Sequence, residues 1–186
     1  MRLFIAIEIP SDVRNALAAL VKELQKTAPK AKWVRPENLH VTLKFLGSTE
    51  EAKRGQIEDT LKAIRSPQPV SLEFRGLGFF PNQKRPRVLW AGMESSANLR
   101  PLAEDIDRSM HGLGFPLEER RFTPHLTLAR FDPAGLPPNL ASAVKQHTSR
   151  GFGSLNAREF HLIESRLKPT AAEYTTLQSF RFVAET

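Results

Sequence analysis

Two short segments of the chain share the pattern His-apolar-Thr-Leu, residues 40–43 and residues 125–128. An imidazole has an ordinary pKa of about 6.5, so near neutral pH one ring can accept a proton while a second ring, kept protonated beside a phosphate, donates one. Cleavage of a phosphodiester needs such a pair, one group to activate the attacking hydroxyl or water and one to protonate the departing oxygen. The pattern therefore predicts that His40 and His125 form the acid–base pair of a metal-free site for phosphate-ester chemistry.

The threonines of the two segments are expected to act together with the histidines. Side chains alternate between the two faces of a β-strand, so Thr42 would share a face with His40, and Thr127 would share a face with His125. Their hydroxyls could then donate hydrogen bonds to the non-bridging phosphate oxygens, where negative charge builds up during the reaction. The alternative is that both threonines only reflect the strand preference of β-branched residues.

Zinc binding is the main competing use of paired histidines, because neutral imidazole is a common zinc ligand. Neither segment has a carboxylate or a third histidine beside it at a ligand-like spacing, and the chain contains no cysteine. We therefore expect no metal and no cofactor. The other three histidines, His111, His147 and His161, lack a threonine two residues later and are expected to be surface or structural residues.

The elements that must position these residues follow from the hydrophobic pattern. Apolar residues at helical spacing predict helices, and short runs rich in β-branched and aromatic residues predict strands. Strands are predicted at residues 3–9, 39–47, 70–79, 87–92 and 125–130, with two final strands around Phe160 and Phe180, and helices at residues 13–24, 57–64, 99–110 and 140–147. Both histidine segments are thus predicted to lie in strands.

The two histidine segments occupy equivalent places in two similar halves of the chain. His40 and His125 are 85 residues apart, and each half reads strand, helix, strand, helix, strand, so an internal duplication is the simplest explanation. Two such halves predict a bilobal, pseudo-symmetric α+β fold, in which two curved, largely antiparallel sheets flank a central cleft and the helices lie outside. At 186 residues the chain fits one domain, 1–186, with two similar lobes and interleaved terminal strands.

Composition narrows the choice of partners. The 27 Lys and Arg residues exceed the 20 Asp and Glu residues, and the formal charge of +7 favours polyanionic ligands, although a merely basic surface has the same composition. No apolar run approaches the roughly 20 residues that span a bilayer, and residues 1–10 read as a strand rather than a signal peptide. We expect a cytoplasmic monomer with no membrane association and no obligate protein partner.

HVTLKFLG, residues 40–47, and HLTLAR, residues 125–130, resemble the paired His-x-Thr-x signatures of the two-histidine phosphoesterase superfamily. The closer resemblance is to its RNA 2′,3′-cyclic phosphodiesterase branch, also described as 2′-5′ RNA ligase. The segments RLFIAIEIP, NLHVTLKFLG, RVLWAGM and RFTPHLTLAR follow one another in the order of that family, so the resemblance covers nearly the whole chain. It implies a bilobal α+β fold with both motifs lining a central cleft.

The same resemblance implies an activity. Enzymes of that family hydrolyse a terminal 2′,3′-cyclic phosphate to a 2′-phosphate without a metal and can, in reverse, join RNA ends through a 2′-5′ bond. Carried onto this chain, the resemblance makes His40 and His125 the acid–base pair and Thr42 and Thr127 the phosphate donors. We assign His125 as the base for water and His40 as the acid for the 3′-oxygen, an order that the symmetry of the halves could reverse. RNA ends or nucleotides with a cyclic phosphate are then the expected partners.

Two further residues follow the motifs. Arg130 matches an arginine that commonly follows the second motif in this family, where it would help to hold the phosphate. It has the parity of the core-facing Leu126 and Leu128, so it needs a bulge, a strong twist or the strand end to reach the cleft, and is otherwise a surface arginine. Phe45 follows the first motif, where an aromatic ring could stack on a nucleobase, although its parity fits burial in the core equally well.

Two other functions fit the sequence. One keeps the chemistry but acts on a small cyclic nucleotide or a nucleotide-sugar derivative, and nothing in the sequence separates it from hydrolysis of RNA ends. The other is a non-catalytic RNA-binding module with a basic cleft. The paired histidines weigh against this second function, because simple binding does not require them.

Overall fold

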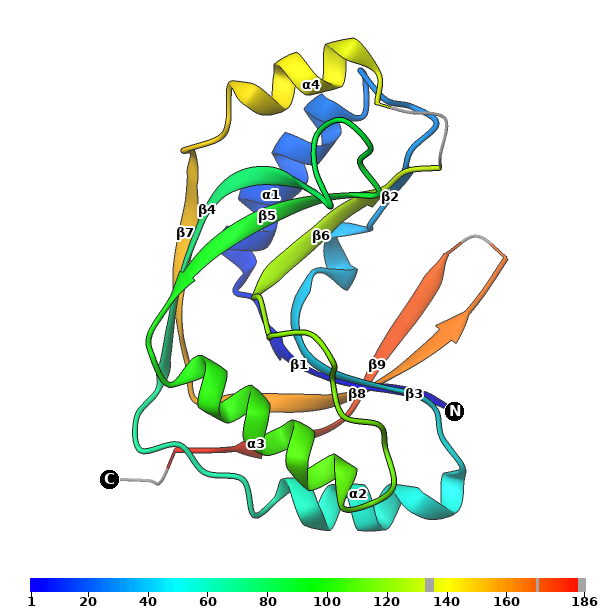
Figure 1. Cartoon of the computed structure of the whole chain (residues 1–186), viewed down its shortest axis with the longest axis vertical. Helices are drawn as coiled ribbons and strands as arrows, with labels where there is room; N and C mark the ends of the chain where they lie inside the picture. The colour runs from blue at the N-terminus through cyan, green and yellow to red at the C-terminus, as the bar shows by residue number, and fades with distance from the viewer. Residues whose placement is uncertain (133–135, 170, 184–186) are drawn as a thin grey trace.

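The computed structural model describes residues 1–132, 136–169 and 171–183, and these form two antiparallel sheets with helices packed outside, which confirms the predicted α+β class (Figure 1). The strands are β1 (Arg2–Glu8), β2 (Lys32–Trp33), β3 (His40–Ser48), β4 (Val70–Phe80), β5 (Val88–Ser95), β6 (His125–Arg130), β7 (Gly151–Ala157), β8 (Glu159–Leu167) and β9 (Ala172–Arg181). The α-helices are α1 (Ser11–Leu24), α2 (Arg54–Leu61), α3 (Leu99–His111) and α4 (Pro138–Lys145), and two short 3₁₀ helices are η1 (Pro36–Asn38) and η2 (Glu51–Lys53).

The first sheet has the strand order β3-β1-β8-β9, and the second has the order β2-β6-β5-β4-β7. Each histidine strand is hydrogen-bonded to the strand that opens its own half of the chain, β3 to β1 and β6 to β5. The halves also exchange strands, because β4 of the first half pairs with β5, and β8 of the second half pairs with β1. Each sheet is therefore built from both halves of the chain.

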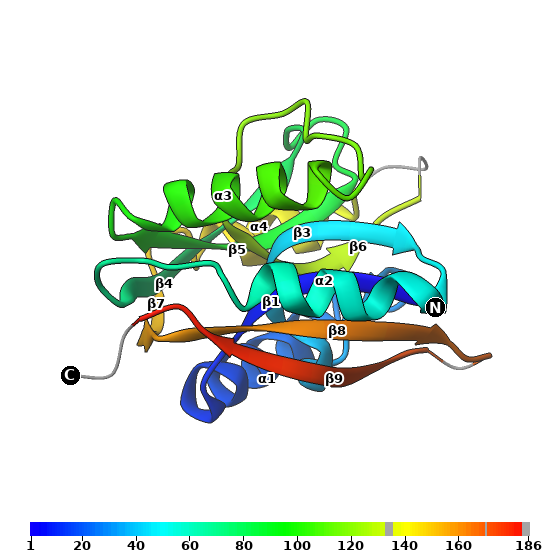
Figure 2. The same cartoon turned by 90° about the horizontal axis from the view of Figure 1, so that it is seen from below.

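The helices cover the outer faces of the sheets. Helix α1 contacts β7 of the second sheet, and α3 contacts both α2 and β3 of the first sheet. Figure 2 shows α1 and α3 at opposite sides of the molecule, with strands of both sheets between them. The apolar face predicted for the first helix is buried, namely Val13, Leu17, Leu20, Val21 and Leu24. Within the described ranges, no helix has both the length and the apolar character needed to cross a bilayer.

Strand β7 was not predicted, because its sequence, GFGSLNA, contains two glycines and few strong strand formers. It forms because it completes the second sheet beside β4, with Phe152 and Ala157 buried at the ends of the segment. Tertiary pairing outweighs local preference here. The very short β2 was also missed, and it adds one more strand beside β6.

The two faces of β1 pack differently, and the difference prepares the site. Leu3, Ile5 and Ile7 belong to the main core. Phe4 and Ala6 point the other way and form a small second cluster with Ile163 of β8, against which Tyr174 of β9 packs, and we call this set the Phe4 cluster. We call the face of the first sheet that carries the Phe4 cluster its site side.

Candidate active site

The two histidines are the first residues of their strands, His40 of β3 and His125 of β6. Those strands belong to different sheets, yet they contact each other in the middle of the molecule (Figure 1). The structure therefore brings the two predicted motifs together, although they are 85 residues apart in the chain.

The threonines follow the predicted alternation. Thr42 pairs with Ala6 of the Phe4 cluster, while Val41 between the two motif residues is fully buried in the main core. Thr127 is likewise half-buried next to the fully buried Leu126. Within the described part of the chain, neither threonine hydroxyl takes part in a hydrogen bond, so both are available to a ligand.

Main-chain groups two residues upstream orient both imidazole rings. The Nδ1 of His125 lies 2.8 Å from the carbonyl oxygen of Thr123, so in the neutral ring Nδ1–H donates to that oxygen and Nε2 remains as an acceptor. The ring of His40 is hydrogen-bonded to the backbone of Asn38. Asn38 is itself anchored, because its Nδ2 donates to the carbonyl oxygen of Ala172 in β9 at 2.8 Å. The two halves thus hold their histidines in the same way.

The surroundings of the two histidines differ. The His40 ring stacks on Phe4, with ring centroids 4.6 Å apart, and meets Tyr174 edge-on at 5.2 Å, whereas His125 is exposed. Burial among these aromatic rings lowers the pKa of His40 to about 4, against the opposing effects of the Asn38 hydrogen bond and the charge of Glu8. In the free protein near neutral pH, His40 is therefore uncharged.

A bulge directly after the first motif decides the direction of Phe45. Ala6 pairs with Thr42 and Ile5 with Lys44, so Leu43 is an extra residue that reverses the alternation. Lys44 consequently turns into the core, where its Nζ binds Asp107 at 2.5 Å. Phe45 turns to the site side, 62% exposed, with its ring 6.1 Å from that of Phe4. Burial of Phe45, which simple alternation allowed, is therefore wrong.

A second bulge at the same place in the other motif turns Arg130 toward the site side. Trp90 pairs with Thr127 and Leu89 with Ala129, so Leu128 is the extra residue. This is the bulge that simple alternation required for Arg130 to reach the cleft. Arg130 is exposed, and its positive charge acts on Tyr174 of the first sheet. Burial raises the pKa of Tyr174, and the charges of Arg130 and Arg2 oppose that rise.

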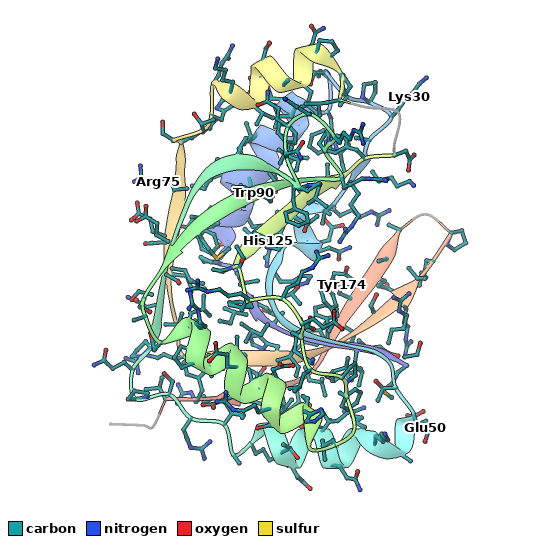
Figure 3. All side chains as sticks on the ribbon, viewed as in Figure 1. Lys30, Glu50, Arg75, Trp90, His125 and Tyr174 are labelled. Carbon is teal, nitrogen blue, oxygen red and sulfur yellow. The ribbon has the colours of Figure 1, made fainter. Side chains whose placement is uncertain are left out.

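Three aromatic residues of the site were not found from the sequence, namely Phe4, Trp90 and Tyr174. Phe4 and Tyr174 surround His40, and Trp90 is paired with Thr127. Figure 3 shows His125 where β6 begins and Tyr174 on β9, both toward the middle of the molecule. All three come from strands that neighbour the motif strands only in space, so no spacing in the sequence could signal them. The one available hint was that Tyr174 is the only tyrosine in the chain.

The remaining histidines have other contacts. His161 is buried, with Nδ1 2.9 Å from the Ser179 hydroxyl oxygen, and the Nδ1 of His111 lies 3.1 Å from the carbonyl oxygen of Phe115. In the described residues, no three His, Asp or Glu side chains gather closely enough to hold a metal ion. That the reaction proceeds without a metal stays a prediction.

Two hollows in the protein surface lie away from the motif residues. One of about 450 Å³ lies between β4 and α4, lined by residues that include Leu77, Phe79 and Lys145, and another of about 360 Å³ lies beside Met1 and Glu50. Neither contains a motif residue. The candidate site is therefore defined by the meeting of the two motif strands.

The structure has two sheets that exchange strands, and one strand of each sheet begins with His-x-Thr. These features define the class of two-histidine phosphoesterases, which the sequence resembles. The model of the LigT-like phosphoesterase family matches residues 7–90 and 92–172. The chain belongs to the LigT-like phosphoesterase family.

The chain is similar to several known proteins along nearly their whole length. A relative from Archaeoglobus fulgidus named RNA 2′,3′-cyclic phosphodiesterase is 36% identical over 180 residues, covering 97% of this chain and 99% of the relative. A relative of the same name from Thermus thermophilus is 36% identical over 200 residues, covering 100% and 92%. The crystal structure of a Thermus thermophilus protein has a TM-score of 0.77 at 34% identity, covering 98% of both chains. Escherichia coli LigT complexed with 3′-AMP has a TM-score of 0.75 at 27% identity, covering 97% of both.

We expect the His40 ring to titrate near pH 4 in the free protein. Because folding disfavours the charged ring, the unfolded chain takes up this proton first, near pH 6.5. The free energy of unfolding should therefore be unaffected by His40 above about pH 6.5 and fall by at most about 3 kcal/mol as the pH drops to about 4. NMR of the imidazole protons measures the titration, and denaturant unfolding at several pH values measures the stability.

The variant His40→Asn identifies the NMR signal of His40, because that signal is absent from its spectrum. The variant should also lose less stability than the unmodified protein as the pH falls from about 6.5 to about 4. A His40 ring that titrates at pH 6 or above would show that burial among Phe4 and Tyr174 does not control its charge.

Proposed function

We propose that this chain is an enzyme that hydrolyses the terminal 2′,3′-cyclic phosphate of RNA to a 2′-phosphate. The observation that carries the proposal is the contact between two strands that each begin with His-x-Thr, with both histidine rings held by the backbone two residues upstream. The relatives named RNA 2′,3′-cyclic phosphodiesterase support the substrate class. No metal, cofactor or second protein takes part in the proposed reaction.

The proposed chemistry is the displacement of the 3′-oxygen by water. A water oxygen forms a bond to phosphorus while the bond from phosphorus to the 3′-oxygen breaks, and the bond to the 2′-oxygen remains. His125 takes a proton from the water, and His40 gives a proton to the departing 3′-oxygen, each contributing roughly 10²- to 10⁴-fold. An RNA 5′-hydroxyl in place of water would complete the same steps with formation of a 2′-5′ bond.

The other site residues would hold the phosphate and the nucleoside. The free hydroxyls of Thr42 and Thr127 can donate to the two non-bridging oxygens, one from each side of the phosphorus atom. Arg130, turned to the site side by its bulge, adds a permanent positive charge. The exposed ring of Phe45, on the same side of β3 as His40, offers a surface on which the terminal base can stack.

The low pKa of His40 places a condition on its role as the acid. An uncharged ring cannot donate the second proton, so the substrate must load His40 by bringing negative charge next to it. Glu8, which already favours the charged ring, is the partner of His40 across the sheet. With the phosphate bound, both neighbours favour the protonated form.

We expect the pKa of His40 to rise well above about 4 when adenosine 2′-phosphate is bound. Repeating the NMR titration with saturating nucleotide measures this, and adenosine, which has no phosphate, is the control ligand. If His40 stays uncharged at the pH of turnover with the nucleotide bound, the roles of the two histidines are exchanged.

The direct test of the function is an oligonucleotide that ends in a 2′,3′-cyclic phosphate, incubated with the protein in excess EDTA. We expect a product with a terminal 2′-phosphate and a rate that EDTA does not change. His40→Ala and His125→Ala should each lower kcat at least about 10²-fold, since each removes one proton transfer. His147→Ala, in the turn that follows α4, is the matched control and should retain the full rate.

Circular dichroism checks that the variants fold. Full activity of either motif variant would refute the acid–base pair, a 3′-phosphate product would refute the choice of leaving oxygen, and loss of activity in EDTA would refute a metal-free reaction. A mononucleotide with a 2′,3′-cyclic phosphate, assayed in parallel, separates RNA ends from small cyclic nucleotides as the preferred substrate.

Arg130→Ala should lower kcat/KM roughly 10- to 100-fold, because it removes a charge-assisted contact to the phosphate. Arg100→Ala, an exposed arginine on α3, is the control and should leave kcat/KM unchanged. The same assay measures both variants. An unchanged kcat/KM in Arg130→Ala would return Arg130 to the surface residues.

A further inference from the structure

The indole ring of Trp90 lies against two glycines, Gly78 and Gly92. Gly78 of β4 pairs with Trp90 of β5, and a methyl group on Gly78 would lie 2.2 Å from Cζ2 of the ring. A methyl group on Gly92 would lie 2.8 Å from the carbonyl oxygen of Arg75 and 3.1 Å from Cζ3 of the indole. Neither glycine has a positive φ, so the backbone conformation does not require glycine at either position. The missing side chains instead provide the room in which the indole lies against the sheet.

This ring is on the side of the second sheet that carries the motif. Trp90 pairs with Thr127, and opposed residues in an antiparallel pair project to the same face. Leu89 and Ala91, on either side of Trp90 in the chain, are fully buried in the core. Gly92 is the partner of His125, so no side chain of β5 stands between the indole and the imidazole. Figure 3 shows Trp90 and His125 near each other on the second sheet.

The ring remains available for a ligand. Trp90 is only partly buried. Within the described residues its indole N–H donates no hydrogen bond, and the indole nitrogen is not one of the buried atoms that lack a partner. Trp33 shows the contrast, since its Nε1 donates to the carbonyl oxygen of Ala28 at 2.9 Å. A tryptophan used only for packing normally satisfies its N–H in that way.

The position of Trp90 relative to the reaction gives it a role. In the proposed function the departing 3′-oxygen and the terminal nucleoside belong to the side of His40 and Phe45, and the attacking group enters on the side of His125. In an in-line displacement these two sides are opposite each other. Hydrolysis needs only a water molecule on the His125 side, so an open aromatic surface there is unnecessary for hydrolysis.

We propose that Trp90 is the stacking platform for the nucleoside that supplies the attacking 5′-hydroxyl, which gives the site a second nucleoside subsite for the 2′-5′ joining that the proposed function already includes. This inference rests on the proposed function and on its assignment of His125 as the base. In the joining reaction the 5′-oxygen bonds to phosphorus, its proton passes to His125, and the 3′-oxygen departs with the proton of His40. Atoms and charges balance without a further reactant.

The kinetic test compares two reactions of the same active site. Trp90→Leu should lower the rate of 2′-5′ joining, or of cleavage of a 2′-5′ diadenosine to the cyclic phosphate, roughly 10-fold more than the rate of hydrolysis of the cyclic phosphate. Trp90→Phe, which keeps an aromatic face, should recover most of that difference. Equal effects on both reactions would overturn the inference, because Trp90 would then serve the terminal nucleoside or the fold.

A binding test leaves Trp90 unchanged. Trp33→Phe makes Trp90 the only tryptophan, so its fluorescence reports the subsite directly. A non-cleavable 2′-5′ diadenosine that lacks the donor 3′-hydroxyl should cause a saturable loss of emission, whereas adenosine 2′-phosphate, which fills only the His40 side, should not. Calorimetry confirms that both ligands bind.

Each result has a distinct meaning. Equal quenching by both ligands, or no quenching by a bound diadenosine, overturns the inference about Trp90. The proposed function still stands in that case if the protein hydrolyses the cyclic phosphate. Failure of the cyclic-phosphate assay overturns the proposed function itself.

Discussion

The contact between β3 and β6 is the constraint on which the candidate site depends, because one phosphate can reach both imidazoles only if the two strands begin at the same place. Exchange of strands between the halves secures this contact. β4 joins the sheet of β6, and β8 joins the sheet of β3, so hydrogen-bonded ladders tie each half to the other. The two histidines are therefore fixed by the whole fold and not by a flexible hinge between two lobes.

Within this frame, one extra residue in each motif strand selects which side chains reach the site. The bulges at Leu43 and Leu128 occupy the same place relative to the two threonines. Phe45 and Arg130 are each the fifth residue after a histidine, so equivalent positions of the two halves carry an aromatic ring and a permanent charge. In the proposed function, the duplicated backbone thus offers one side of the site to a base and the other to a phosphate, an asymmetry that would suit a nucleotide better than a symmetric ligand.

The sequence predicted what depends on local alternation and missed what depends on neighbours in space. His40, Thr42, His125 and Thr127 were placed correctly relative to the core, because the strand repeats every two residues as far as each threonine. Beyond each threonine a bulge interrupts this alternation, so the sequence did not determine whether Phe45 is exposed. For Arg130, the sequence showed only that a bulge, a strong twist or the strand end was needed for the side chain to reach the cleft. Phe4, Tyr174 and Trp90 were missed because hydrogen bonding between strands, not spacing along the chain, brings them to the motifs.

The two histidines have different environments although the two halves of the chain are similar. Acid–base catalysis by a pair of histidines needs such a difference, because one ring must be protonated while the other is neutral. In two identical and independent imidazoles, at most half of the molecules would hold one protonated and one neutral ring, and either ring would be the protonated one equally often. Here Phe4 and Tyr174 bury His40 and lower its pKa, while His125 is exposed and held by the Thr123 carbonyl alone. On the proposed assignment, a ring that is neutral until an anion arrives would become an acid only when a substrate is in place. In the proposed reaction, the aromatic residues around His40 would therefore couple its protonation to the binding of a phosphate, and the residues involved come from three strands of one sheet, β1, β3 and β9.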